Sequence, residues 1–139
     1  MTRRTALFPV LVVSTFFIAG CGGSVLTGPS TVTGAPWKLQ SIEALAGGLV
    51  GISRPDNYTV EFTDASRLSV KADCNTCSGT YSLSGASLSV GALACTKAFC
   101  GAASSDTAFL EVLSNATSIG VRGIELSIDS SRGTLRLTR

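Results

Sequence analysis

The sequence predicts a small α+β domain in which about seven short antiparallel strands form a curled, open-barrel-like sheet with one amphipathic helix. From residue 37 onward, apolar and polar residues mostly alternate with a period of two, which is typical of strands that bury one face. Residues 104–118 differ, because their apolar side chains recur at helical spacing. Short runs rich in Gly, Ser, Asn and Asp separate these segments and indicate tight turns.

The first twenty residues are predicted to be an export signal. Arg3 and Arg4 precede an apolar run, residues 6–18, that is too short to cross a bilayer comfortably. The following Ile18-Ala19-Gly20, placed directly before Cys21, resembles a bacterial lipobox, in which the chain is cut before the cysteine and that cysteine is acylated. We therefore expect lipidation at Cys21, with several acyl chains for stable anchoring. An ordinary secretory signal or an uncleaved anchor is the alternative.

Residues 21–36 are predicted to be the lipidated N-terminus and a flexible tether, because they are rich in Gly, Ser, Thr and Pro without any period. This places the folded domain at residues 37–139. Gly22 follows the cysteine, and not the Asp that retains many lipoproteins in the inner membrane of Gram-negative bacteria. We therefore expect a lipid-anchored protein of the bacterial cell envelope, with the outer membrane favoured.

Within the domain, seven segments carry the alternating pattern of strands. They are residues 37–42, 58–63, 67–71, 81–83, 88–90, 124–128 and 135–138. The second and third segments are predicted to form one hairpin, and the fourth and fifth form another across Ser84-Gly85-Ala86. In the helical segment, Ser104 or Ser105 can serve as N-cap, and Asp106 lies in the first turn, where the helix dipole favours an anion.

Charge and composition exclude several classes of function. Without residues 1–20 the chain has nine basic and nine acidic residues, so it lacks the positive charge with which proteins bind nucleic acids. The chain contains no histidine. This excludes Ser-His-Asp and Cys-His nucleophilic systems and His-liganded metals. We expect no catalytic residues, no metal site and no cofactor, and hence a protein that is not an enzyme.

Four cysteines, Cys74, Cys77, Cys95 and Cys100, lie within residues 72–100 and require an explanation. In an exported protein of this size we expect two structural disulfides, although four thiols allow three connectivities. A zinc site is the second interpretation, but the last two cysteines are spaced unusually for one. The third is a redox centre at Cys74-Asn75-Thr76-Cys77, although strands and loops surround this motif instead of the helix that such chemistry uses.

Several motifs, in order along the chain, resemble the META domain, the family of the bacterial heat-shock protein HslJ. They are Trp37-Lys38-Leu39, Asp73-Cys74-Asn75, Ser78-Gly79-Thr80-Tyr81, Thr96-Lys97-Ala98-Phe99-Cys100 and Phe109-Leu110-Glu111-Val112-Leu113. The resemblance covers residues 37–139. It implies a small α+β domain, often in envelope lipoproteins, linked to stress tolerance and without an established catalytic activity.

The resemblance also bears on the cysteines. It pairs Cys74 with Cys100, which leaves Cys77 and Cys95 as an additional bridge, whereas a shifted register would pair Cys74 with Cys95 and Cys77 with Cys100. Asp73 stands where the family usually has Gly, so we expect a less strained backbone there than in relatives.

Taken together, these predictions describe a non-enzymatic envelope lipoprotein with a binding or structural role in stress tolerance. Its expected partners are the membrane, through the N-terminal lipid, and an unidentified envelope protein or apolar ligand, with no nucleic acid involved. We expect a monomer. The alternatives are a thiol-disulfide redox protein that uses Cys74 and Cys77, and a carrier that encloses an apolar ligand within the sheet.

Overall fold

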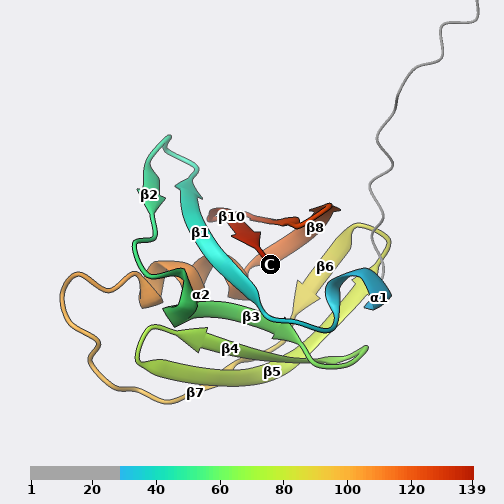
Figure 1. The fold of residues 1–139 in the computed structure, drawn as a ribbon, viewed down its shortest axis with the longest axis horizontal. Coiled ribbons are helices and arrows are strands. Elements are labelled where there is room, and N and C mark those ends of the chain that lie inside the picture. The colour runs from blue at the N-terminus through green and yellow to red at the C-terminus, as the bar shows by residue number, and fades with distance from the viewer. Residues whose placement is uncertain (1–28) are drawn as a thin grey trace, which may run out of the picture.

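The structure, a computed structural model, describes residues 29–139 and shows one barrel-like antiparallel sheet with a helix at one end (Figure 1). The predicted export signal, the lipidation site at Cys21 and residues 22–28 of the predicted tether lie outside the described residues. In chain order the elements are α1 (Pro29–Val32), β1 (Trp37–Ala44), β2 (Leu49–Gly51), the 3-10 turn η1 (Pro55–Asn57), β3 (Tyr58–Phe62), β4 (Arg67–Ala72), β5 (Asn75–Ser84), β6 (Ser87–Val90), β7 (Ala94–Cys95), α2 (Asp106–Ser114), β8 (Ala116–Arg122), β9 (Glu125–Ser130) and β10 (Gly133–Thr138).

Eight of the ten strands within residues 29–139 form a closed ring. The order is β1-β3-β4-β5-β6-β8-β9-β10, and β10 pairs with β1 to complete it. The contact between β6 and β8 is the shortest seam, with the single residue pair Ser87 and Ser118. β2 and β7 lie outside the ring, beside β1 and β5 respectively. The predicted class, a small curled α+β sheet with one amphipathic helix, is therefore confirmed, but the predicted strand number was too low.

The difference in strand number has a local cause. Ala116 fits the helical spacing of α2, and this extended the predicted helix over residues that form β8. The structure ends α2 at Ser114, and the next residues pair with β9 along its whole length. Ile119 and Val121 are apolar residues two positions apart, as in a strand with one buried face. The residue between them is Gly120, which disfavours a strand, so the pattern is weak. β2 and β7 have only three and two residues, which is too short for a sequence pattern to reveal.

Alternating side chains fill the interior of the barrel. In β4, for example, Leu68, Val70 and Ala72 are buried while the residues between them are exposed. Trp37, Phe62 and Phe109 are the largest fully buried side chains. An eight-stranded barrel is just wide enough for such side chains to fill it.

The two ends of the barrel are closed by different segments, and Figure 1 shows α1 and α2 on opposite sides of the molecule. At one end, called here the helix end, α2 inserts Phe109, Val112 and Leu113 into the core. At the other, called here the N-terminal end, Val32 is fully buried and Thr33 forms a parallel bridge with Phe62. Both ends are therefore covered by chain that is not part of the ring.

Residues 29–36, predicted as the last part of a flexible tether, are packed against the N-terminal end. The indole Nε1 of Trp37 donates to the carbonyl oxygen of Val32 at 2.8 Å. The guanidinium of Arg139, at the end of the chain, lies 3.9 Å from the centre of the Trp37 ring and donates to the carbonyl oxygens of Thr31, Val32 and Thr33 at 3.2, 2.8 and 3.0 Å. Residues 29–36, before the predicted boundary at Trp37, are thus packed on the domain, because Val32 buries an apolar side chain that composition alone did not place.

Two turns depend on particular side chains. Asp64, between β3 and β4, accepts hydrogen bonds from the amides of Ser66 and Arg67, both at 2.8 Å, and from Arg67 Nε at 2.7 Å. These donors hold the pKa of the Asp64 carboxyl well below its usual value, the Ser66 amide most strongly. Gly133 begins β10 with φ +146°, and a Cβ there would collide with the carbonyl oxygen of Glu43 on β1. The β1 and β10 backbones can therefore meet to close the ring only with glycine at this position.

Candidate functional site

The four cysteines of the domain form two disulfides at and near the helix end of the barrel. Cys74 is bonded to Cys100 with a Cα–Cα distance of 5.5 Å, and Cys77 is bonded to Cys95 at 4.0 Å. Cys77 and Cys95 lie directly opposite each other where β7 pairs with β5. This is the connectivity that the family resemblance implied. The two bridges fasten the irregular segment between β6 and α2 to the barrel wall.

Asn75, which sequence reasoning did not single out, is the centre of this region. Within residues 31–139 it is the one polar residue that is buried, with 4% of its surface exposed. Its Oδ1 accepts from the Ala98 amide at 2.8 Å and from the Thr96 hydroxyl at 3.0 Å, and its Nδ2 donates to the Ala98 carbonyl oxygen at 3.0 Å. A buried amide with several partners fixes the loop that passes over it. The Asp73-Cys74-Asn75 motif is part of the family resemblance, but nothing in its local pattern indicates the role of the Asn75 amide.

The geometry of the cysteines does not resemble a redox centre. In a Cys-x-x-Cys redox site the two cysteines bond to each other, whereas Cys74 and Cys77 here bond to different partners. Cys77 is also buried, at 4% exposure. Among residues 29–139 no group of three or more Cys, Asp and Glu side chains is arranged to hold a metal ion.

Asp73 precedes the first cysteine in the two-residue turn between β4 and β5. Its φ of +56° is left-handed, a conformation that Asp tolerates better than most residues with a side chain. The structure does not show the expected relief of strain, because the backbone of Asp73 is itself left-handed. The Ser104 hydroxyl holds the pKa of the Asp73 carboxyl below its usual value, and the Asn57 amide also donates to it at 3.3 Å.

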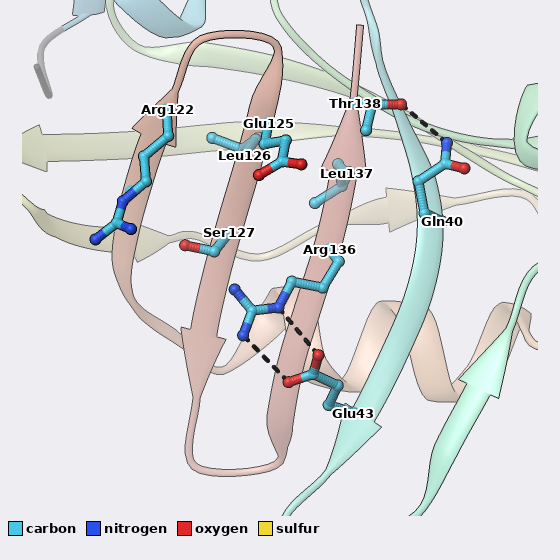
Figure 2. A pocket seen from close by; sticks show the side chains of 10 residues that line it. Gln40, Glu43, Arg122, Glu125, Leu126, Ser127, Arg136, Leu137 and Thr138 are labelled. Atoms are coloured by element: carbon cyan, nitrogen blue, oxygen red, sulfur yellow. Dashed lines mark hydrogen bonds and ion pairs between the residues drawn. The ribbon is translucent and has the colours of Figure 1, made fainter. Parts of the chain in front are cut away.

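A shallow groove of about 670 Å³ crosses the outer face of β8, β9, β10 and β1 (Figure 2). Gly120, Ser127 and Arg136 occupy one row across three of these strands, since Gly120 pairs with Ser127 and Ser127 pairs with Arg136. The absence of a side chain at Gly120 and the short one at Ser127 leave the hollow. The buried side chains Leu126 and Leu137 form part of its lining.

Charged side chains of both signs border this groove. Arg136 donates two hydrogen bonds to Glu43, at 3.1 and 3.2 Å, and the carboxylate raises the pKa of Arg136 above its usual value. Arg122 and Glu125 occupy facing positions on β8 and β9, and within residues 29–139 neither forms an ion pair. Figure 2 shows their side chains extending in different directions. The groove therefore presents a free cation, a free carboxylate and a hydroxyl, a set of groups suited to binding a polar partner.

A family model, the META domain, matches residues 30–139, which is most of the chain. The chain belongs to the META domain family. A search of curated proteins found no match. Two solved structures are similar: an NMR structure of a protein from Burkholderia xenovorans, with a TM-score of 0.66, 20% identity and coverage of 89% of this chain and 98% of that one, and a second NMR structure, with a TM-score of 0.62, 20% identity and coverage of 81% and 95%. At this level of identity the likeness establishes the fold alone.

The META domain of this chain starts, by that match, close to the first described residue. Residues 30–36 therefore belong to the domain by sequence as well as by packing. In the described part of this META domain no helix is long and apolar enough to cross a membrane. The predicted lipidation site, Cys21, lies outside both the matched and the described residues.

Proposed function

We propose that this chain is a non-enzymatic binding protein of the bacterial cell envelope, anchored by acyl chains on Cys21, whose META domain acts in stress tolerance through its outer surface. The observation that carries the proposal is the arrangement of the barrel. Its interior is filled by side chains such as Trp37, Phe62 and Phe109, and both cysteine pairs are joined, so a partner would bind on the outside, where the groove offers charged and polar groups.

The two alternative functions receive less support from the same features. A carrier of an apolar ligand needs an enclosed space, but the inward-facing side chains of the barrel pack against one another. A thiol-disulfide enzyme needs an accessible, reactive pair of cysteines, but Cys77 is buried and is joined to β7. A binding surface that carries Arg122, Glu125 and Ser127 suits an envelope protein with polar side chains of both signs.

The packing of the N-terminal end supports the proposed anchor. Pro29 is eight residues from Cys21 in sequence, and such a segment spans at most about 28 Å when fully extended. Because Arg139 and Trp37 hold residues 31–33 against the barrel, an acylated Cys21 would keep the N-terminal end close to the membrane surface. We place the protein in the outer membrane, because Gly22 lacks the inner-membrane retention signal, and expect it to be monomeric.

Intact-mass measurement on the membrane-extracted protein tests the anchor. We expect loss of residues 1–20 and the added mass of acyl chains at Cys21, and the Cys21→Ala variant should lack the added mass. An amino terminus at any other residue would refute the lipoprotein assignment.

Complementation tests the binding role. In a strain that lacks the gene, the wild-type protein should restore growth under envelope stress, whereas Arg122→Glu should not. Lys97→Glu is the matched control, because Lys97 is equally a surface cation but lies outside the groove. Full restoration by Arg122→Glu, at equal amounts of folded protein, would exclude the groove as the functional surface.

A further inference from the structure

β2 differs from the other strands of the barrel wall because it has a partner on one side only. It pairs with β1 over Leu49–Gly51 and is the terminal strand in the sheet order. The barrel closes through β1 and β10, so closure does not cover β2. In Figure 1, β2 stands apart from the barrel next to the tip of β1. All three of its residues are exposed.

The register shows which backbone groups of β2 point away from β1. Ala44 donates its amide to the Gly48 carbonyl oxygen at 2.7 Å, and Ile52 donates to that of Gln40 at 2.8 Å. Hydrogen-bonded and non-hydrogen-bonded pairs alternate along an antiparallel ladder. The backbone N–H and C=O groups of Val50 therefore point toward β1, whereas those of Leu49 and Gly51 point away from it. Within residues 29–139, the amides and carbonyls of Leu49 and Gly51 have no hydrogen-bond partner. Two donors and two acceptors therefore lie along a free edge, two residues apart.

A cleft of about 330 Å³ lies beside this edge. One wall is the end of β2 and residues 52–54, and the other is the loop of residues 100–105. The far wall is held in place by the Cys74–Cys100 disulfide and by Tyr58, whose hydroxyl accepts from the Ser105 amide at 3.0 Å. A Cβ at Gly51 would have no neighbour within 4 Å. The face of β2 at Gly51 is therefore open, and a strand added to the free edge would lie about 4.8 Å from β2.

The surroundings of the edge are apolar. Leu45 and Leu49 are 73% and 69% exposed, and Val50 is 47% exposed. Phe99, next to Cys100 on the opposite loop, is 88% exposed. Leu45, Leu49 and Val50 belong to one short hairpin of β1 and β2, and neighbouring exposed apolar side chains are typical of a surface that another molecule covers. β2 is short, and its three residues carry no charge, whereas charged side chains are one of the features that keep other edge strands from pairing.

We propose that the outer edge of β2 binds an extended segment of a partner polypeptide as an additional strand, with apolar side chains of that segment packed on Leu45, Leu49 and Val50. The occupant follows from the chemistry. Backbone donors and acceptors at a two-residue spacing match an extended polypeptide, and the apolar rim matches alternate apolar side chains on it. This site lies near the helix end and is separate from the outer groove, so it goes beyond the function proposed above.

The test uses the full chain, extracted in detergent micelles and labelled with 15N-leucine and 15N-glycine, and a blocked peptide of alternating Val and Thr with Lys at both ends. We expect the amide resonances of Leu49 and Gly51 to shift on titration, while those of Gly85 and Gly123, in turns at the N-terminal end, stay unchanged. The same peptide with N-methyl groups at every Val and Thr should lose binding, because neither edge of its Val-Thr segment then has amide hydrogens to donate to β2. Unchanged Leu49 and Gly51 resonances at saturating peptide, or equal binding of the N-methylated peptide, would overturn the proposal.

A pair of variants provides the matched control. Leu49→Asp should reduce the affinity for the peptide at least tenfold. Ile124 is 66% exposed at the opposite end of the barrel, and Ile124→Asp should leave the affinity unchanged. Equal effects of the two variants would contradict the site. If Leu49 and Gly51 shift with protein concentration alone, and the mass doubles, the edge pairs with a second copy and the proposed partner is wrong.

Discussion

Arg139 is predicted to hold the N-terminal segment of the domain against the barrel, and replacing it with glutamine should loosen that segment. The guanidinium stacks on Trp37 and donates to three consecutive carbonyl oxygens of residues 31–33. The stacking contributes about 1 kcal/mol, and the best of the three hydrogen bonds, at 2.8 Å to the partly buried Val32 carbonyl, adds about 1.5 kcal/mol. The other two are exposed and add little. Arg139→Gln should therefore destabilise the domain by about 2.5 kcal/mol, or about 10 °C in Tm.

Urea unfolding followed by fluorescence measures this effect directly, because Trp37 is the only tryptophan in the chain. Hydrogen exchange of the amides of residues 31–34 should accelerate at the same time. Arg136→Gln is the matched control. It removes an exposed arginine of β10, the strand that ends one residue before Arg139, and the ion pair of Arg136 with Glu43 contributes less than about 1 kcal/mol. If Arg139→Gln costs no more than this control and exchange at 31–34 is unchanged, the segment is held by Val32 alone and the reasoning is refuted.

Three further predictions concern the interior and the turns of the domain. Asn75→Ala removes a buried amide that binds the loop at Ala98 to β5. With both disulfides intact, the free energy of unfolding measured in urea should fall by about 2 to 3 kcal/mol. A negligible change would mean that the disulfides alone hold the loop. The Asp64 carboxyl has a lowered pKa in the folded state, so the unfolded state binds more protons in acid. The stability that the ionised Asp64 contributes is therefore complete above the pKa of the unfolded state and is lost as the pH falls below that pKa. The Tm of Asp64→Asn should accordingly fall less steeply than that of the wild type below about pH 4, and parallel curves would argue against this. Gly133→Ala should destabilise far more than Gly123→Ala, which meets no atom within 4 Å and costs about 1 kcal/mol for its positive φ, and comparable thermal shifts would show that β1 and β10 can separate without penalty.

Much of the cysteine region could be anticipated from the chain. The family resemblance implied the pairing of Cys74 with Cys100, and a hairpin with its turn at Gly85 brings Cys77 near Cys95, although the sequence also left a shifted register open. The role of Asn75 was not predicted, because its hydrogen-bond partners, such as Thr96 and Ala98, lie about twenty residues away in the sequence. The groove on the outer face was equally hidden. Its members come from four strands and share no local pattern.

What the sequence alone determined is the class of the protein: alternating strands, one helix at Phe109 and its neighbours, a domain without histidine, and the META family. These properties are local, because periodicity, turn chemistry and motif spacing are each readable within a few residues. Only the tertiary structure decided that the sheet closes between β1 and β10, that Arg139 secures residues 31–33 and that β2 keeps a free edge. Each of these depends on contacts between segments far apart in the chain, for which a local pattern carries no information.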